Sequence, residues 1–475
     1  MSLPLESKQA HLAVADGQHD STFVPAAQRV VRDLFGSVDE RKFGVRYWDG
    51  TSEWPAEMPR FSLDIRRPSA LRRMLVPPSE LSIVEAYLYG DIDIDGDIEA
   101  AASLGDIAVG RIGSLSGATH LLRDALELPT DEESRSEESA HARVARRLIR
   151  FGREHSSRRD AAAVRFHYDV GNAFYALWLD RRMVYSCGYF ARGDESLDDA
   201  QVAKLDLVCR KLRLTHGERL LDIGCGWGAL VIHAAKHYGA QAVGITLSEQ
   251  QAAWARERVA REGLSDRVTI SVRDYRTLNA PEAFDKISSV GMVEHVGLKR
   301  LPDYFDAAYR VLAPGGLFLN HGIISIADAR PHSLLNPLWR RLWRRDQFIR
   351  RYVFPDGDLV PSARVIASAE EQGFELRDVE SLRDHYVTTL RHWVHRLEEH
   401  EHDARRMVGD VTYRVWRLYM AASAHGFASG RIGIIQSLLA KPDAEGRARV
   451  PRTRDDLYAS KLADTAPTLE VPRAG

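Results

Sequence analysis

Asp222-Ile-Gly-Cys-Gly-Trp-Gly228 lies between the apolar run Arg219–Ile223 and the helix-periodic stretch Ala229–Tyr238. This order predicts a buried strand, a glycine-rich turn and a helix. Glycines let the backbone approach a ligand closely, and the helix N-terminus behind them favours the ligand's polar groups. Dinucleotide-binding turns have the spacing G-x-G-x-x-G, whereas the glycines here follow G-x-G-x-G. The turn therefore predicts a bound cofactor, with a tight turn that binds nothing as the alternative.

Further strand and helix patterns alternate along the chain after this turn. The predicted strands are Arg219–Ile223, Gln241–Thr246, Val268–Val272, Phe284–Val290 and Gly316–Asn320, and the predicted helices are Ala229–Tyr238, Glu249–Glu262 and Leu301–Leu312. Strand–helix–strand repeats at this spacing indicate an α/β fold with a parallel, doubly wound sheet. Residues 325–355 interrupt the pattern as a long insertion.

The region before this sheet has the mixed pattern of a smaller α+β domain. Phe43–Trp48 and Arg60–Ile65 alternate like strands, while Pro68–Val76 and Ser79–Tyr89 are predicted helices. An acidic, serine-rich stretch typical of a linker comes next, followed by a strongly basic stretch. The predicted organisation is a flexible tail at 1–25, an N-terminal domain at 26–128, an acidic linker and basic helix at 129–165, the α/β domain at 166–445 and a C-terminal tail at 446–475.

Composition narrows the classes of function. Of the 475 residues, 44% are hydrophobic and 28% are charged, which is ordinary for a soluble globular protein. The formal net charge is -2 and no nucleic-acid-binding motif is present, so we expect no nucleic acid partner. Three cysteines and no secretory signal between Met1 and Asp20 indicate a reducing cytoplasm. The sequence contains no run of about 18 apolar residues, so we predict no membrane span. We also predict no metal site.

Five further motifs carry a resemblance to a known family. They are His167–Asn172, Tyr185–Phe190, Gly244–Gln251, Met292–Gly297 and His385–Leu390. Together with the glycine turn, these motifs closely resemble the cyclopropane fatty-acid synthases and the related mycolic acid cyclopropane synthases. The resemblance runs from about Phe166 to Pro442 and implies a Rossmann-like class I methyltransferase domain that uses S-adenosylmethionine. The N-terminal domain is more loosely similar to the extra domain of phospholipid-acting members, which implies a lipid-engaging domain.

The resemblance also implies which residues surround S-adenosylmethionine. The expected set is Tyr185, Ser186, Asp222, Gly224, Cys225, Gly226, Trp227, Gly228, Thr246, Leu247, Gln251, Asp274 and Tyr275. Asp274 follows the third predicted strand, where a carboxylate could meet an adenine amine. A surface loop residue is the alternative interpretation of Asp274.

The chemistry of this family requires a base. An isolated alkene that attacks the methyl group of a sulfonium leaves a carbocation on the acyl chain, and a proton must be lost before a three-membered ring can close. Such a reaction needs a dry site and a base within hydrogen-bond reach. The family uses a bound bicarbonate ion as this base. The resemblance implies that the bicarbonate pocket consists of Cys187, Glu294, His321, Ile323 and Tyr386.

The side chains of this expected pocket suit an oxyanion. A thiol, an imidazole and a phenol can donate hydrogen bonds, while Glu294 would accept one from the bicarbonate hydroxyl and so position the base. Taken singly, Cys187 could be a buried hydrophobe and His321 a core histidine, and their joint presence favours the site. Ser423 stands where some members carry a cysteine with an assigned catalytic role. The mechanism needs no nucleophile there, so we assign Ser423 none.

A basic and aromatic part of the insertion is the predicted membrane contact. Trp339–Arg345 and Phe348–Tyr352 combine arginine with large aromatics, a pattern that suits anionic headgroups. A solvated arginine face over an apolar groove is the alternative. We expect a cytoplasmic protein that associates peripherally with the inner face of the membrane. The expected partners are a phospholipid with an unsaturated acyl chain and, transiently, an anionic membrane surface, while formation of a homodimer stays open.

The favoured reaction transfers a methylene group from S-adenosylmethionine to a cis double bond of a phospholipid acyl chain and forms a cyclopropane. The same carbocation gives a methylene-branched chain, the precursor of a 10-methyl fatty acid, when the proton is lost without ring closure. The family branch associated with that product lacks counterparts of His295 and His321, so their presence here favours the ring. A non-catalytic lipid-binding paralogue and a small-molecule methyltransferase are the rivals. The intact glycine turn and the complete bicarbonate set oppose the first rival, and the insertion and the N-terminal domain oppose the second.

Overall fold

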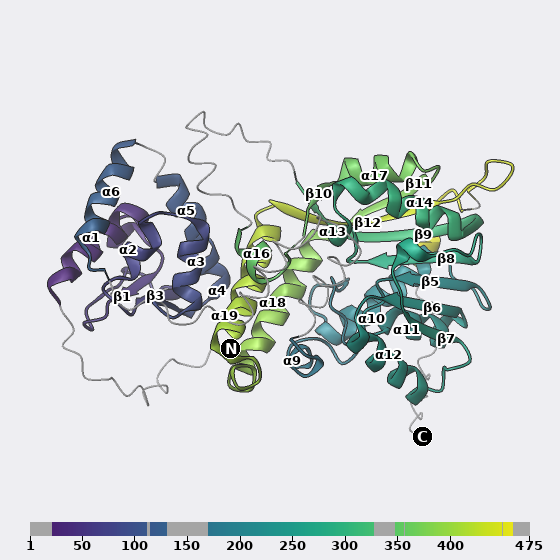
Figure 1. Ribbon diagram of the computed structural model, residues 1–475, viewed down its shortest axis with the longest axis horizontal. Coiled ribbons are helices and arrows are strands. Elements are labelled where there is room, and N and C mark those ends of the chain that lie inside the picture. Colours follow the sequence, from purple (N-terminus) through teal and green to yellow (C-terminus); the bar gives the residue numbers. More distant parts are fainter. Residues whose placement is uncertain are drawn as a thin grey trace, which may run out of the picture. The chain divides into compact units, whose positions relative to one another are not determined.

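Figure 1 shows the computed structural model, which describes residues 21–111, 115–130, 170–326, 347–355, 357–448 and 450–458. The chain divides into two units: the residues up to Asp97 and Leu104–Ser134 belong to the first, whereas Ile98–Ser103 and the residues from Arg135 onward belong to the second. Most of the expected N-terminal tail, nearly all of the linker and basic helix, the arginine-rich segment Trp339–Arg345 and the end of the C-terminal tail lie outside the described residues.

The first unit contains a four-stranded sheet with the order β2-β1-β3-β4. The strands are β1 (Gly44–Arg46), β2 (Ser52–Glu53), β3 (Phe61–Ile65) and β4 (Ile92–Gly96), and the helices are α1 (Val24–Phe35), α2 (Ala70–Leu75), α3 (Glu80–Leu88), α5 (Leu104–Arg111) and α6 (Leu115–Glu127). β1 is parallel to β3, and the other neighbours are antiparallel. α3 begins where Ser79 Oγ accepts a hydrogen bond from the Ser82 amide at 3.0 Å. The predicted α+β class of this unit is confirmed.

The second unit is built on a larger sheet with the order β11-β12-β9-β8-β5-β6-β7. The strands are β5 (Arg219–Ile223), β6 (Gln241–Thr246), β7 (Val268–Val272), β8 (Phe284–Val290), β9 (Leu312–Ser325), β11 (Glu375–Ser381), β12 (Ile432–Ala440) and a short β10 (Val360–Pro361) beside β9. β5 to β9 run parallel, as predicted for a Rossmann-like α/β fold. At one edge the sheet continues beyond the predicted parallel strands, because β12 is antiparallel to both β9 and β11.

Helices cover both faces of this sheet (Figure 1). They are α10 (Leu197–Lys211), α11 (Ala229–Tyr238) and α12 (Glu249–Arg261) on one face, and α14 (Leu301–Val311) and α17 (Ser362–Glu370) on the other. In β5, Leu220 packs into the core under α10, α11 and α12, whereas Leu221 and Ile223 pack into the core under α14 and α17. Burial on both faces explains why apolar residues are adjacent in β5, where Leu220 and Leu221 pack into opposite cores.

Two long helices, α18 (Arg383–Glu399) and α19 (Glu401–Ala428), form a hairpin in the second unit, and α19 is interrupted at Gly409. The short α4 (Ile98–Ala102) packs against α19, and Arg391 Nε donates to Glu99 Oε2 at 2.7 Å. The remaining helices are α9 (Asn172–Ala176), α13 (Val293–Val296), α16 (Gln347–Tyr352), α20 (Asp455–Tyr458) and the 3-10 helices η1 (Ser21–Phe23), η2 (Val38–Glu40), η3 (Tyr275–Thr277) and η4 (Leu298–Arg300). Within the described ranges, no helix has the length and apolarity needed to cross a bilayer.

The strand order fixes where a ligand can bind. From β5 the chain moves outward through β6 to β7, and it then returns to place β8 on the opposite side of β5. Open α/β sheets bind ligands at the carboxyl ends of the strands where the order reverses in this way. That point is the edge formed by the ends of β5 and β8, next to the glycine turn.

Candidate functional site

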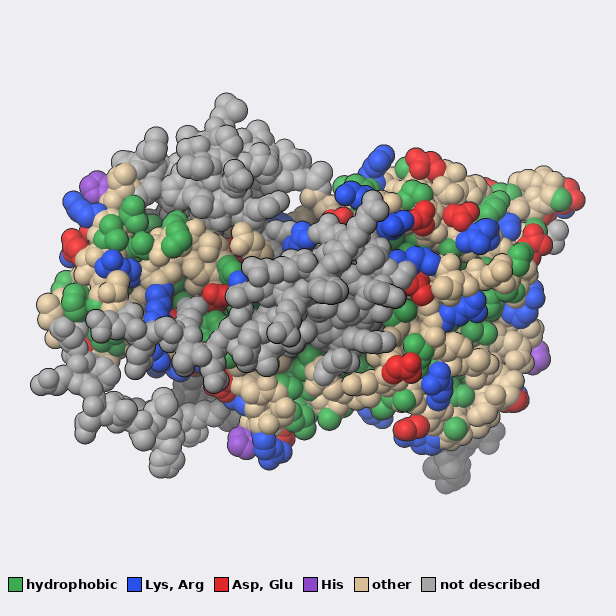
Figure 2. Space-filling model, in the orientation of Figure 1, with side chains coloured by type: hydrophobic (Ala, Val, Ile, Leu, Met, Phe, Trp, Pro, Cys, Tyr) green, Lys and Arg blue, Asp and Glu red, His purple; other side chains and the backbone are tan. Residues whose placement is uncertain are grey.

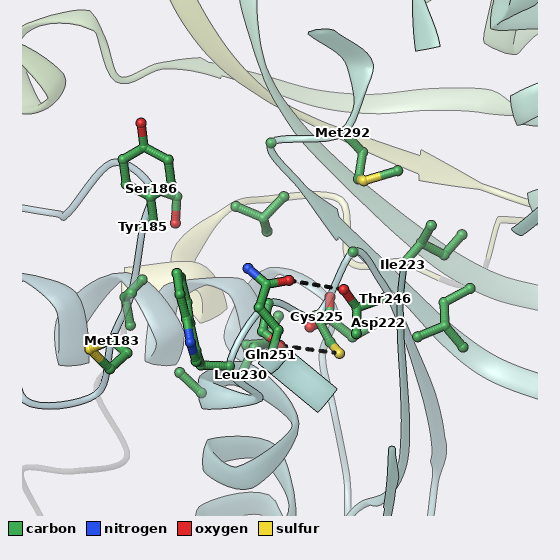
Figure 3. Close-up of a pocket in the computed structure, with 18 of the residues that line it drawn as sticks. Met183, Tyr185, Ser186, Asp222, Ile223, Cys225, Leu230, Thr246, Gln251 and Met292 are labelled. Atoms are coloured by element: carbon green, nitrogen blue, oxygen red, sulfur yellow. Dashed lines mark hydrogen bonds between the residues drawn. The ribbon is translucent and has the colours of Figure 1, made fainter. Parts of the chain in front are cut away.

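A pocket opens at this reversal point (Figure 3). Eleven of the thirteen residues expected around S-adenosylmethionine line it: Tyr185, Ser186, Asp222, Gly224, Cys225, Gly226, Trp227, Thr246, Leu247, Gln251 and Tyr275. They come from the ends of β5 and β6, from the start of α12, from η3 and from the segment before α10. The structure therefore brings together residues that lie up to ninety positions apart, as the motif order suggested. Gly228 and Asp274 are not among the residues that line the pocket.

The glycines of the turn have different surroundings. A Cβ atom at Gly224 would lie 2.6 Å from the Met292 side chain, and one at Gly228 would lie 3.0 Å from Ala255 Cβ. These two glycines therefore allow close packing, and Gly228 serves the contact between α11 and α12. A Cβ at Gly226 would meet no protein atom within 4 Å, and its φ is +52°. Gly226 thus faces open space beside the pocket.

Polar atoms in the pocket are already arranged by hydrogen bonds. The buried Asp222 carboxylate accepts from Ser288 Oγ at 2.7 Å. Burial raises the pKa of Asp222 to about 6, against the effect of the Ser288 hydrogen bond and of the positive charge of Lys204. On the next strand, Thr246 Oγ1 donates to Gln251 Oε1 at 2.9 Å.

Asp274 does not turn toward the pocket. Its carboxylate accepts from the Arg276 guanidinium, with an Nη2–Oδ2 distance of 2.6 Å, and from the Arg276 amide at the start of η3. Short acidic side chains often bind the backbone two residues further on, as the Asp274 carboxylate does here. The neighbouring Arg273 and Tyr275 line the pocket instead.

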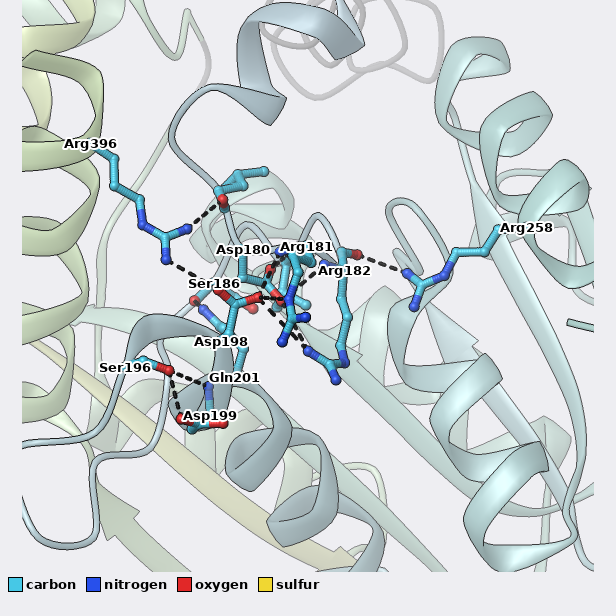
Figure 4. A network of polar contacts seen from close by, with 12 residues as sticks. Asp180, Arg181, Arg182, Ser186, Ser196, Asp198, Asp199, Gln201, Arg258 and Arg396 are labelled. Carbon is cyan, nitrogen blue, oxygen red and sulfur yellow. Dashed lines mark hydrogen bonds and ion pairs between the residues drawn. The ribbon is translucent and has the colours of Figure 1, made fainter. Parts of the chain in front are cut away.

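The segment that carries Tyr185 and Ser186 is fixed by a polar network (Figure 4). The Val184 amide donates to Asp180 Oδ1 at 2.7 Å, and Gln201 Nε2 donates to the Ser186 carbonyl at 2.8 Å. Burial raises the pKa of Asp180, and the backbone hydrogen bonds oppose this rise. The network holds the segment against α10, so that its side chains form one wall of the pocket.

Aromatic rings enclose Tyr185. The ring centroids of Tyr175, Trp178, Trp393 and Trp416 lie between 5.2 and 6.2 Å from that of Tyr185. Such a wall excludes water, and its π faces attract positive charge.

Tyr419 of α19 extends the aromatic wall toward Ser423. Burial raises the pKa of Tyr419 to about 12, while side-chain hydrogen bonds to Tyr185 and Ser423 oppose the rise. Ser423 therefore contacts the wall through Tyr419, one helical turn away.

The Glu294 carboxylate lies at the start of α13, after the end of β8. The Ile323 amide donates to Glu294 Oε1 at 2.5 Å, whereas the buried Oε2 has no hydrogen-bond partner among the described residues. Burial raises the pKa of Glu294 from 4.5 to about 7. Burying a carboxylate oxygen without a hydrogen-bond partner lowers the stability of the folded protein unless a further donor reaches that oxygen.

His321 lies two residues before Ile323 on β9 and is similarly half-satisfied. Gln436 Nε2 lies 3.1 Å from His321 Nδ1, while the buried His321 Nε2 has no partner in the described part of the chain. Burial lowers the pKa of His321 well below 6.5, so the ring is neutral. Because the Gln436 amide nitrogen is a donor, Nδ1 accepts and the ring proton sits on Nε2, ready for an acceptor.

Cys187 and Tyr386 meet at one carbonyl group. Cys187 Sγ and the Tyr386 amide both contact the Leu382 oxygen, at 3.7 and 3.0 Å. The Leu382 amide donates to the carbonyl of Ile434, which pairs with Ile323 across β12 and β9. Burial raises the pKa of the Cys187 thiol, which keeps it protonated as a donor. Hydrogen bonds therefore connect the five residues expected in the bicarbonate pocket through the paired strands β9 and β12 and through Leu382, which precedes α18.

Sequence reasoning missed Lys204, which also lines the pocket, and did not assign Met292 and His295 of the Met292–Gly297 motif to the cofactor, although both line it as well. Lys204 had a signal: it falls on the buried stripe of α10 at helical spacing from Ala200 and Leu197. A lysine on an apolar stripe is rarely left there without a polar partner.

The fold and the position of the pocket define the second unit as an S-adenosylmethionine-dependent methyltransferase. The model of the mycolic acid cyclopropane synthetase family matches residues 155–437, and the chain belongs to this family. A domain family of unknown function, DUF7884, matches residues 30–103.

Curated relatives extend the similarity to most of the chain. A probable fatty acid methyltransferase of Pseudomonas putida is 40% identical over 87% of this chain and 95% of its own length. The cyclopropane-fatty-acyl-phospholipid synthase of Escherichia coli is 39% identical over 60% of this chain and 69% of its own length.

Solved structures agree with this assignment. The cyclopropane synthase MmaA2 from Mycobacterium tuberculosis matches with a TM-score of 0.55 and 34% identity, over 59% of this chain and 97% of that one. Mycolic acid cyclopropane synthase CmaA1, solved with SAH and CTAB, matches with the same TM-score, identity and coverage. The similarity to proteins that bind this cofactor supports S-adenosylmethionine as the methyl donor here.

Proposed function

We propose that this protein transfers a methylene group from S-adenosylmethionine to a cis double bond of a phospholipid acyl chain and closes a cyclopropane ring. The observation that carries the proposal is the pair of unsatisfied buried atoms, Glu294 Oε2 and His321 Nε2. One is an acceptor and the other a donor. Glu294 lies in sequence between the pocket residues Met292 and His295, and the His321 carbonyl accepts a hydrogen bond from the amide of the pocket residue Gly291. Bicarbonate offers the complementary pair, a hydroxyl and oxyanion oxygens, so these residues suit it.

Each residue of this group has a distinct part in the proposed reaction. When bound, bicarbonate supplies the base. Neutral His321 donates to an oxyanion through Nε2, the Cys187 thiol and the Tyr386 phenol are further donors, and Glu294 accepts from a hydroxyl. The Ile323 amide fixes Glu294 by its hydrogen bond to Oε1. These contacts orient the base and exclude water from it.

The reaction balances without an external oxidant or reductant. The π electrons of the alkene form a bond to the methyl carbon as the carbon–sulfur bond breaks, and S-adenosylhomocysteine leaves with that electron pair. The former methyl group then loses a proton, and its C–H electrons form the second ring bond. The aromatic wall around Tyr185 lowers the energy of the intermediate cation.

A second candidate product is a methylene-branched acyl chain. The similarity to a probable fatty acid methyltransferase over 87% of the chain favours this alternative. It requires only that the proton be lost from another carbon. His295, which lines the pocket, and His321, on β9, favour ring closure, because the resemblance implies that the branch-forming members lack their counterparts.

Fatty-acid analysis of an expressing host tests the proposal. We expect a gain of one CH2 mass per modified chain, together with the gas-chromatographic retention of a cyclopropane standard. The retention of a branched standard would support the second candidate. No mass gain in the expressing host or with purified protein on unsaturated phospholipid vesicles would contradict both.

The membrane contact is proposed to lie in the arginine-rich insertion. Figure 2 shows basic and acidic side chains intermixed on the visible face of the second unit, so attraction to an anionic surface needs a local cluster. Arg340, Arg341, Arg344 and Arg345 supply one in the sequence. The first unit offers exposed apolar side chains instead, with Trp54 exposed to 47% and Met58 to 80%.

Replacing Arg340, Arg341, Arg344 and Arg345 with glutamine is expected to weaken binding to anionic vesicles at least about tenfold, since each arginine contributes on the order of 1 kcal/mol near such a surface. Binding is measured by sedimentation with vesicles, and added salt should weaken the binding of the parent protein in the same assay. The control replaces four exposed arginines of the second unit, Arg300, Arg310, Arg406 and Arg447. If the insertion variant binds vesicles as the parent does but has a lower melting temperature, the proposal is wrong and the first unit is the better candidate for the membrane contact.

A further inference from the structure

A second pocket of the methyltransferase unit is lined mainly by basic side chains. It has a volume of about 330 Å³ and lies along α11, with further walls from α10, α12 and the segment Arg181–Arg182. Four of its lining residues are arginine or lysine, two are histidine and one is acidic: Arg181, Arg182, Lys236, Arg258, His233, His237 and Glu262. It shares only Leu205 and Ala229 with the cofactor pocket, so it is a separate site.

Two side chains that line this pocket have a buried nitrogen without a hydrogen-bond partner among the described residues. Arg182 Nη1 lies 4.0 Å from the carboxylate oxygens of Asp180 and Asp198, too far for a hydrogen bond. His233 is 6% exposed, and its Nε2 lies 3.9 Å from Asp206 Oδ1. Leaving such groups unpaired lowers the stability of the folded protein. An anion in the pocket would supply the acceptor that they lack.

The charges around the pocket do not balance. Glu262 is the one carboxylate that lines it, and this group already accepts from Arg258 Nε at 2.9 Å and from Lys236 Nζ at 3.2 Å. Arg181 pairs with Asp198, which does not line the pocket, and Arg182 keeps only the distant contacts. A concave site with an excess of one charge attracts ligands of the opposite charge.

We infer that this pocket binds a phosphoryl group, with Arg182 as its main ligand and His233, Lys236 and Arg258 around it. A guanidinium presents several N–H donors in a plane that matches the oxygens of a phosphate, and lysine adds a compact charge. Small-molecule sites start at a volume of about 300 Å³, so the pocket has room for a phosphate and a small substituent. A free phosphate compound and a phospholipid headgroup both offer this group. The inference depends neither on S-adenosylmethionine nor on the lipid product.

The two histidines admit one competing occupant, a divalent metal ion. His233 and His237 lie one turn apart on α11, and their ring centroids are 4.5 Å apart. Their surroundings oppose a cation: burial lowers the pKa of His237, and the positive charges of His233 and Lys236 lower it further, against the effect of Asp206. An environment that disfavours a proton on His237 also disfavours a metal dication.

Calorimetry at fixed ionic strength tests the inference on the parent and on Arg182→Gln. The ligands are inorganic phosphate and, separately, dihexanoyl phosphatidylglycerol below its critical micelle concentration. The parent should bind at least one of them with a Kd of about 1 mM or lower. Arg182→Gln should weaken that binding about tenfold, as expected for the loss of a charge-assisted hydrogen bond. Binding of inorganic phosphate alone would identify a free phosphate compound, and lipid binding that Arg182→Gln weakens would identify a headgroup.

Glu262→Gln should have the opposite effect. It removes the one negative charge from the lining and releases Arg258 and Lys236, so phosphoryl binding should strengthen about fivefold, the size expected of one screened charge a few ångströms away. Damage to the fold does not improve binding, so this variant decides even if Arg182→Gln is unstable. Arg310→Gln is the matched control, because Arg310 is exposed, pairs with Asp306 on α14 and does not line the pocket. It should bind as the parent does.

Three results would overturn the inference. The first is a parent that binds neither ligand with a Kd of about 1 mM or lower. The second is parent affinity in a folded Arg182→Gln or in Glu262→Gln, which would place the anion elsewhere in the protein. The third is a parent that binds Zn²⁺ but not phosphate and loses the metal in His233→Phe, which would make the pocket a metal site. Each result would leave the proposed lipid reaction standing, because mass analysis of the product tests that reaction separately.

Discussion

Glu294→Gln is expected to lower turnover by about a hundredfold or more, the range over which positioned proton transfer contributes to catalysis. An amide presents an N–H donor or a weaker acceptor where the bare Oε2 now lies, so it cannot hold a bicarbonate hydroxyl in the same way. Affinity for S-adenosylhomocysteine should stay within about twofold, since Glu294 does not line the cofactor pocket. Steady-state kinetics with unsaturated phospholipid vesicles, and calorimetry on the same preparation, measure both quantities.

The bicarbonate dependence separates this role from general damage to the fold. Parent activity should fall in degassed buffer and recover when bicarbonate is added, whereas Glu294→Gln should respond weakly to either treatment. Glu257→Gln, on the exposed side of α12, is the matched control and should behave like the parent. Near-parent turnover of Glu294→Gln would remove Glu294 from the mechanism.

The pH profile gives an independent readout. Burial raises the pKa of Glu294 to about 7, so the carboxylate form, which accepts the hydroxyl, prevails only above this pH. Parent turnover should therefore rise with a midpoint near pH 7, and Glu294→Gln should lose this limb of the profile. A parent profile that is flat between pH 6 and 8 would contradict the assigned role.

The central strands were predictable because their signal is local. The bounds of β5, β6, β7 and β8 coincide with the predicted ranges. Each strand carries apolar residues at buried positions and is followed by turn residues, although β8 also contains Asp285, Lys286 and two serines. β11 lacks this signal: its one buried position is Asp378, which pairs with Arg454. β12 depends on pairing with β9, far earlier in the chain, and no local pattern specifies that partner.

The pocket shows the same division between local and long-range information. The glycine turn could be predicted because its residues are contiguous. The other residues expected to line the pocket were predicted from the resemblance to the family. The expected role of Asp274 stays a prediction: its carboxylate binds the backbone and side chain of Arg276, and Asp274 is not among the residues that line the pocket. Lys204 was missed because the meaning of a lysine on a buried helical stripe depends on the segment that packs against it, here the one carrying Ser186.

Gly226→Val is expected to lower affinity for S-adenosylhomocysteine by more than about a hundredfold. A Cβ at this position would meet no protein atom within 4 Å, and Gly226 lines the pocket, so the valine side chain would extend into the space that we propose for the ligand. Ligand atoms cannot share the volume that the valine side chain occupies. Calorimetric titration, with circular dichroism to confirm the fold, measures the loss.

The valine also strains the backbone, and this effect has to be separated from the steric one. Gly226 has a φ of +52°, a left-handed conformation that costs an L residue roughly 1–2 kcal/mol and a β-branched residue more. Gly263, which follows α12, has a φ of +68°, and a Cβ added there would likewise meet no protein atom within 4 Å, but this glycine lies outside the pocket. Gly263→Val should therefore show a similar fall in melting temperature with parent-like affinity. Equal affinity loss in both variants would mean that backbone strain, and not occupied ligand space, explains the effect, and the turn would lose its assignment as the cofactor loop.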